Sequence, residues 1–72
     1  MEILFFKTNI ASPIGIQAIW DSLKTLGVNY FVIDFIGINK VLRVMCENFI
    51  PSEKIIEVIS NLGYRCEELA VS

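Results

Sequence analysis

The chain has 72 residues, of which 54% are hydrophobic and 19% are charged, and its formal net charge at neutral pH is -2. A chain of this length buries only about 60% of the surface that its unfolded state exposes. We therefore expect one domain, residues 1–72, with an efficient core. The six basic residues stand singly, which excludes a basic surface for nucleic acid or anionic lipid. Histidine, a common general base and metal ligand, is absent.

No apolar run approaches the roughly 18 residues that a bilayer-spanning segment needs. The first seven residues include Glu2 and lack the basic start and long apolar core of a signal peptide. We therefore expect a soluble, cytoplasmic protein. Cys46 and Cys66 are the two cysteines of the chain. Free buried thiols are the first expectation for them in that compartment, with a disulfide or a metal pair as the alternative.

Three segments have the composition of β-strands. Residues 3–10 divide into two alternating faces, one ending in Ile10 and the other in Lys7 and Asn9, and residues 28–36 and 41–46 are rich in β-branched and aromatic side chains. The turn-forming residues 37–40 join the last two segments, which predicts an antiparallel hairpin. The residues expected on the inner face are Leu4, Phe6, Thr8, Ile10, Phe31, Ile33, Phe35, Leu42 and Val44.

Two segments have helical periodicity. Ser12 and Pro13 are typical of an N-cap and a first helical residue, so a helix is predicted over residues 13–26, with Gly27 just beyond it. A second helix is predicted to begin at Pro51, or later with Ser52 as its cap, and to end at Gly63. Residues 64–69 then form a short fourth strand. The buried helical positions are expected to be Ile16, Ile19, Trp20, Leu23, Leu26, Ile55, Ile56, Ile59 and Leu62.

The order strand, helix, strand, strand, helix, strand predicts an α+β, ferredoxin-like βαββαβ sandwich. In this topology a four-stranded antiparallel sheet has the strand order 4-1-3-2 and carries both helices on one face. Cys46 and Cys66 would then lie on strands that the first strand separates, which argues against a disulfide between them.

At this point the chain resembles a known family, the heavy-metal-associated domains of copper chaperones and metal-transporting P-type ATPases. The resemblance covers nearly the whole chain, with the pieces in the family's order. These pieces are Phe6-Lys7-Thr8-Asn9-Ile10, Leu26-Gly27-Val28, Ile33-Asp34, Lys40-Val41-Leu42-Arg43-Val44, Pro51 with Ile55-Ile56, and Leu62-Gly63-Tyr64.

The resemblance implies a site for Cu(I) or another soft metal ion, held by a C-x-x-C motif after the first strand. Thiolates suit such an ion because soft cations bond to sulfur better than to oxygen. Ser12 and Gly15 occupy the two cysteine positions here, and Ile10 stands where many members have methionine. We therefore expect no metal and no cofactor at this loop. Tyr64 matches a family tyrosine near the loop, so Ile10, Ser12 and Tyr64 are the residues predicted to face a partner there.

Other sites have less support from the residues. Met45 and Cys46 are neighbours on a strand, so their side chains point to opposite faces and cannot hold one ion together. Glu67 and Glu68 are separated in the same way, and no carboxylate converges with a nucleophile, so we expect no enzyme. The solvent-facing side of the sheet is the remaining candidate, as an apolar contact patch. The residues expected there are Ile3, Phe5, Tyr30, Val32, Ile36, Val41 and Met45.

The function predicted from these observations is a non-enzymatic, ligand-depleted relative of heavy-metal-associated domains, acting through protein contact in the context of metal transport. A protein partner or a homodimer through the sheets would use the apolar patch. The alternative is an active copper or heavy-metal carrier with unconventional or intermolecular ligands, Cys46 and Cys66 included. A small-molecule sensing module is a third alternative, which no set of residues supports.

Overall fold

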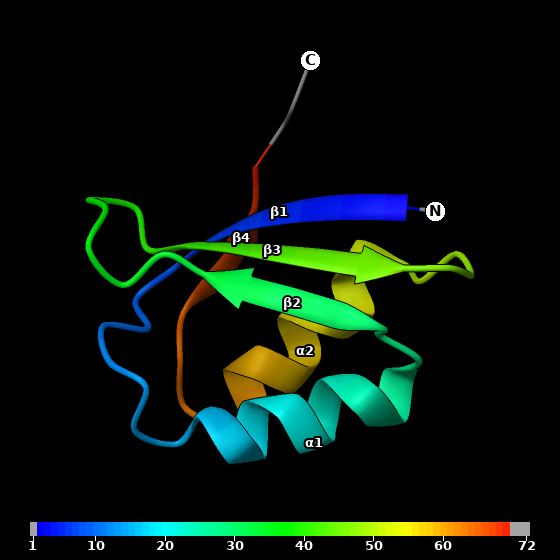
Figure 1. The fold of residues 1–72 in the computed structure, drawn as a ribbon, viewed down its shortest axis with the longest axis horizontal. Helices are drawn as coiled ribbons and strands as arrows, with labels where there is room; N and C mark the ends of the chain where they lie inside the picture. The colour runs from blue at the N-terminus through cyan, green and yellow to red at the C-terminus, as the bar shows by residue number, and fades with distance from the viewer. Residues whose placement is uncertain (1, 70–72) are drawn as a thin grey trace.

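Figure 1 shows a computed structural model of the chain, which describes residues 2–69. The four strands form one layer, and both helices lie on the same side of it (Figure 1). The expected βαββαβ sandwich is therefore confirmed. The elements are β1 (Glu2–Thr8), α1 (Ile16–Leu26), β2 (Tyr30–Ile33), β3 (Val41–Cys46), α2 (Ser52–Asn61) and β4 (Cys66–Glu68).

The sheet has the order β2-β3-β1-β4, and each neighbouring pair of strands is antiparallel. This is the predicted order 4-1-3-2, counted from the other edge. Cys46 is opposite Glu2, whereas Cys66 is opposite Thr8 at the far end of β1. The two thiols are free, and β1 separates them as the topology predicted.

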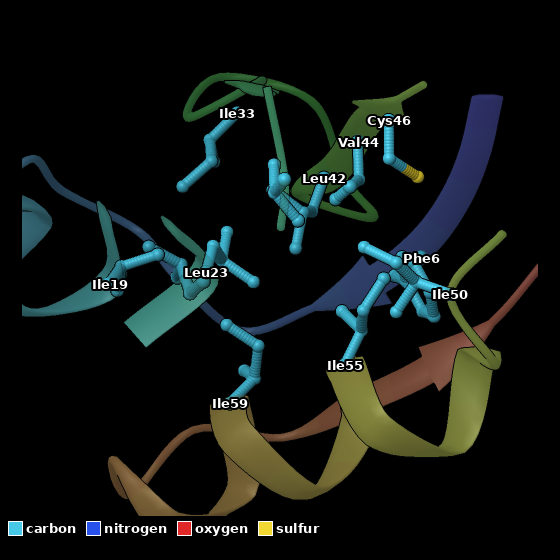
Figure 2. Packing of buried hydrophobic residues seen from close by; sticks show 12 residues of the cluster. Phe6, Ile19, Leu23, Ile33, Leu42, Val44, Cys46, Ile50, Ile55 and Ile59 are labelled. Atoms are coloured by element: carbon cyan, nitrogen blue, oxygen red, sulfur yellow. The ribbon is translucent and has the colours of Figure 1, made fainter. Parts of the chain in front are cut away.

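The core lies between the sheet and the two helices (Figure 2). Alternation along β1 and β3 turns one set of side chains toward the helices, and the 3.6-residue period of the helices supplies the facing set. The fully buried side chains are Phe6, Ile10, Ile19, Leu23, Leu42, Val44, Cys46, Ile55 and Ile59. Burial of apolar area is the main stabilising contribution in so small a domain. In residues 2–69, no helix has the length and hydropathy needed to cross a membrane.

Three strands are shorter than the sequence predicted. The first strand ends at Thr8 and not at residue 10, and the fourth spans Cys66–Glu68 and not 64–69. The second spans Tyr30–Ile33 and not 28–36, because both of its flanks are held in other conformations. Before it, the Val28 N–H donates to the Leu23 carbonyl as part of the end of α1, with Gly27 in the left-handed conformation.

After β2, Asp34 turns the chain. Its Oδ1 accepts the backbone N–H groups of Ile36 (3.0 Å) and Gly37 (2.9 Å), an arrangement typical of an aspartate-initiated turn. These bonds also hold the pKa of the Asp34 carboxyl below its usual range, because they stabilise its charged form. The prediction that Ile36 lies on the outer face of a strand is therefore wrong. Ile36 lies in the β2–β3 loop.

The second helix begins one residue later than Pro51. Pro51 is itself the cap residue, with an extended backbone (φ -59°, ψ 136°), and Ser52 is the first helical residue. A helix beginning at Pro51 would have had Ile50 as its cap, and the later start would have had Ser52; neither residue is the cap. Ile50 is instead 7% exposed and part of the core, which its apolar side chain favours. Gly63 follows the helix in the left-handed conformation, as predicted.

Candidate functional site

The candidate site is the β1–α1 loop, residues 9–15, where the resemblance places a metal-binding motif. It lies at the end of the sheet where the β2–β3 loop also lies (Figure 1). Thr8 fixes the two loops together. Its buried hydroxyl donates to the Lys40 carbonyl (2.7 Å) and accepts the N–H of Ile10 (3.2 Å), while its own N–H donates to the Asn39 carbonyl (3.2 Å). A β-branched residue with a hydroxyl can serve both the strand and the loop.

The other side of the loop is fixed to the segment before β4. The Asn9 side-chain oxygen accepts the backbone N–H of Arg65 at 2.8 Å. Ile10 then turns into the core and is 0% exposed. The prediction that Ile10 faces a partner is therefore wrong, because its side chain is an internal anchor of the loop. The strand alternation, which placed Ile10 on the inner face, was the correct signal.

Residues 13–16 form a turn and not the first turn of a helix. The N–H of Ile16 donates to the Pro13 carbonyl at 3.0 Å, and Gly15 has φ 85° and ψ 3°, the values of the third residue in a type II turn. Gly15 is also the N-cap residue of α1, since its carbonyl accepts the N–H groups of Ala18 and Ile19. The predicted helix start at Pro13, with Ser12 as its cap, is therefore wrong. A left-handed residue cannot lie inside a right-handed helix, so α1 begins after Gly15.

Tyr64 lies against this turn. Its hydroxyl donates to the Ile14 carbonyl at 3.4 Å, and a Cβ atom built at Gly15 would meet the Tyr64 oxygen at 3.0 Å. Real Cβ atoms rarely come that close to another heavy atom. The hydroxyl of Tyr64 would therefore have to move by a few tenths of an ångström to accommodate a side chain at position 15. The loop conformation and the tyrosine fit each other as long as residue 15 is glycine.

The residues at the loop do not fit a soft metal ion. Ser12 is exposed and offers a hard, protonated oxygen, and Gly15 offers no side chain. Among residues 2–69, no three Cys, Asp or Glu side chains are grouped so that they could hold a metal ion. The chemistry expected of a C-x-x-C motif therefore has no donor at these two positions.

Cys46 lies opposite Glu2, at the end of β1 far from the loop, whereas Cys66 is opposite Thr8 and lines a hollow together with Asn9. The pKa of each thiol is raised, which favours its protonated form. Burial, and next the carboxylate of Glu2, raise the pKa of the Cys46 thiol, and its side chain is 0% exposed. Burial raises the pKa of the Cys66 thiol to about 11. Metal ligation and nucleophilic chemistry both require the thiolate. Neither thiol is therefore activated as a nucleophile at neutral pH, and a metal ion would have to displace the proton of either one.

Three isoleucines at the loop end are nearly bare, and of these the sequence predicted only Ile36 to be exposed, although on a strand and not in a loop. Ile14 is 81% exposed in the β1–α1 loop, and Ile36 and Ile38 are 93% and 99% exposed in the β2–β3 loop. Both loops lie at the same end of the molecule (Figure 1). The strand alternation placed Ile36 on the outer face of a strand, and it gave no prediction for the exposure of Ile14 and Ile38. The sequence signal that could have identified Ile14 is its position between Pro13 and Gly15, two residues that are typical of turns.

The outer face of the sheet carries most of the apolar patch expected from the sequence. Across it, Ile3, Met45 and Tyr30 form one row, and Phe5, Arg43 and Val32 form the next. Tyr30 is 57% exposed, Ile3 50% and Val32 36%. A shallow hollow of about 270 Å³ lies there, lined by Phe5, Val32, Asp34, Val41 and Arg43. The placement of these side chains follows from the register, and their role as a contact surface stays a prediction.

Solved structures of known proteins share this fold. The yeast copper transporter domain Ccc2a, whose solution structure covers the apo and Cu(I)-loaded states, matches with a TM-score of 0.80 and 22% identity over 100% of both chains. The N-terminal domain of ZntA in its Zn(II) form matches with a TM-score of 0.75 and 17% identity, over 97% of this chain and 94% of that chain. The chain thus has the fold of heavy-metal-associated domains, as the sequence resemblance predicted. No protein-family model and no curated protein matches the sequence.

Proposed function

We propose that this chain is a non-enzymatic protein-interaction module with the fold of heavy-metal-associated domains, working in the context of metal transport without carrying an ion in its β1–α1 loop. The observation that supports the proposal best is the contact between Tyr64 and position 15. A side chain at that position would meet the tyrosine hydroxyl at 3.0 Å, and Gly15 has φ 85°, which L-residues rarely adopt. A side chain at position 15 would therefore strain the backbone and would require the Tyr64 hydroxyl to move by a few tenths of an ångström.

The surfaces available for protein contact support the same proposal. Isoleucines that are more than four-fifths exposed form no part of a core, and their exposure has a cost in water that a binding partner would remove. Ile14, Ile36 and Ile38 present such side chains at the loop end of the molecule. The module would meet its partner with apolar loop tips at the place where a metal carrier presents its thiols.

A metal carrier that uses Cys46 and Cys66 is the alternative function. Two observations disfavour it within one chain. The strand β1 lies between the two cysteines, and Cys46 is fully buried in the core. An ion shared between two chains would have to draw on Cys66 and displace its proton, which costs more because burial raises the pKa of this thiol to about 11.

Native mass spectrometry with one equivalent of Cu(I), and separately of Zn(II), tests the proposal. We expect no adduct that survives a modest competing chelator. An ion that is retained by the wild-type chain and lost in Cys46→Ser or Cys66→Ser would favour the carrier function. Circular dichroism of each variant is the control for its folding.

A second arm rebuilds the missing motif. The double variant Ser12→Cys/Gly15→Cys supplies both thiols, and adding Tyr64→Phe removes the oxygen that lies 3.0 Å from the new Cβ. We expect the triple variant to retain Cu(I) against the chelator and the double variant to retain it less well. Folded variants that both fail to bind would contradict the inference that the absent thiols and the Tyr64 hydroxyl are what prevent this loop from holding an ion.

A further inference from the structure

One edge of the sheet is open. β2 is the first strand in the order β2-β3-β1-β4 and is paired only with β3. The Asp34 N–H donates to the Val41 carbonyl, so the register makes Val32 the next residue that bonds to β3. The alternation ends at the start of the strand, where the Asn29 N–H donates to the Met45 carbonyl. The N–H and C=O groups of Phe31 and Ile33 therefore point away from the sheet. Within residues 2–69, no hydrogen bond in the loops, turns or side chains uses them.

The composition of β2 leaves this edge without the usual protection. Natural sheets blunt an exposed edge with lysine, proline or inward-pointing charges. The segment Tyr30-Phe31-Val32-Ile33 contains none of these. The opposite edge strand, β4, has only three residues, and two of them are Glu67 and Glu68. Self-association through β4 would bring carboxylates together, whereas β2 offers a neutral, apolar strand.

A hollow beside the edge adds apolar contact area. Trp20 on α1 stacks at a tilt against Phe31, with ring centroids 5.5 Å apart. A hollow of about 180 Å³ lies there, lined by Trp20, Tyr30 and Phe31. A strand added to β2 would place side chains of its inner face next to the rings of Trp20 and Phe31. The edge therefore combines unused backbone groups with an aromatic wall on the helix side.

We propose that a second copy of this chain pairs with β2 in antiparallel orientation, on a two-fold axis through Val32, and joins the two sheets into one. In this register Phe31 of one copy is opposite Ile33 of the other, and the two residues exchange backbone hydrogen bonds. The symmetry repeats this pair on the other side of the axis. Val32 faces its own counterpart, and Tyr30 faces Asp34, so no two like charges are opposed. We choose this register because it pairs the outward-pointing backbone groups of Phe31 with those of Ile33.

The second copy is the occupant that this edge matches by symmetry. An antiparallel pair of identical strands matches its donors and acceptors around the two-fold axis, and this strand carries no charge that would oppose itself. The proposal goes beyond the proposed function, because it concerns a different surface and does not depend on whether the β1–α1 loop binds metal.

Sedimentation of the full chain over a range from micromolar to millimolar concentration tests the association. We expect the mass to rise toward twice the monomer mass. Val32→Lys puts two ammonium groups opposite each other on the axis and should restore the monomer. Ile3→Lys is the matched control, because Ile3 is 50% exposed on the same outer face but on the inner strand β1. It should leave the dimer intact.

A disulfide trap tests the register directly. Facing residues in a pair without mutual hydrogen bonds have Cα atoms about 4.5 Å apart, a distance that a disulfide can bridge. In a Cys66→Ser background, Val32→Cys should form a covalent dimer under mild oxidation, and Ile3→Cys should not. A monomer at every concentration would overturn the proposal. A dimer that Ile3→Lys breaks and Val32→Lys leaves intact would also overturn it, since that result places the contact on the sheet face.

Discussion

β1 supplies both the hydrophobic core and the β1–α1 loop, and the two depend on the sequence in different ways. Phe6, on β1, is fully buried among side chains from β3 and the helices, where apolar character and volume decide the fit. At the end of β1 and in the loop that follows it, the chain needs particular groups at three positions: a hydroxyl at Thr8, an amide at Asn9 and no side chain at Gly15. The core tolerates many sequences, whereas the loop conformation depends on a few atoms.

The largest difference is expected between Phe6→Ala and Ile14→Ala. Removing the buried ring leaves a cavity and should cost about 3–5 kcal/mol, a large share of the stability of a domain whose total is of order 5 kcal/mol. Ile14 is 81% exposed, so its truncation should change the free energy of unfolding by less than about 0.5 kcal/mol. Urea unfolding followed by circular dichroism measures both. A large loss for Ile14→Ala would mean that the loop tip is part of the core.

Thr8 is the test of whether one hydroxyl holds the loop. Thr8→Val keeps the shape and leaves the Lys40 carbonyl and the Ile10 N–H without their partner, which should cost about 1–3 kcal/mol. Thr8→Ser is the matched control, since it keeps the hydroxyl and loses only a methyl group. The same unfolding experiment applies. If the serine variant were the less stable of the two, packing and not hydrogen bonding would determine the role of Thr8.

These differences explain which features could be predicted from the sequence. The strand faces, the sheet order and the helix ends at Gly27 and Gly63 follow from periodicity and from the conformations that glycine allows, so they were predicted well. The start of α1 was not, because Ser12-Pro13 suits a helix start as well as a turn. The left-handed Gly15, which decides between them, is visible only in three dimensions.

The site shows the same division. The missing thiols at Ser12 and Gly15 could be identified from the sequence, because the metal chemistry depends on residue type. The contact between Tyr64 and position 15 could not, since the two positions are far apart in the chain and meet only through the fold. The burial of Ile10 was predicted by alternation, and assigning it a partner-facing role disregarded that signal.

Gly15 and Gly63 both have the left-handed conformation, so alanine substitutions at the two positions distinguish the cost of backbone strain from the cost of a side-chain contact. Gly15→Ala adds a methyl group at φ 85° that also meets the Tyr64 oxygen at 3.0 Å, whereas a Cβ at Gly63, with φ 96°, meets nothing within 4 Å. Each substitution should cost about 1–2 kcal/mol for the backbone, and Gly15→Ala should cost more than Gly63→Ala. Adding Tyr64→Phe should remove the excess. Equal losses for both alanines, with or without the tyrosine, would contradict a specific contact at the loop.

The smallest effect concerns Cys66, where burial raises the pKa to about 11 from the reference value of 9.0. The folded state favours the protonated thiol, so its contribution to stability is complete below pH 9 and is lost as the pH rises through 11. Alkylation with iodoacetamide should accordingly be slow near pH 8 and accelerate with a midpoint near pH 11. Cys66→Ser should remove this labelling, because the other thiol, Cys46, is fully buried. Rapid labelling near pH 8 in the folded chain, lost in Cys66→Ser, would show an exposed and reactive thiol, and would return the metal-carrier function to consideration.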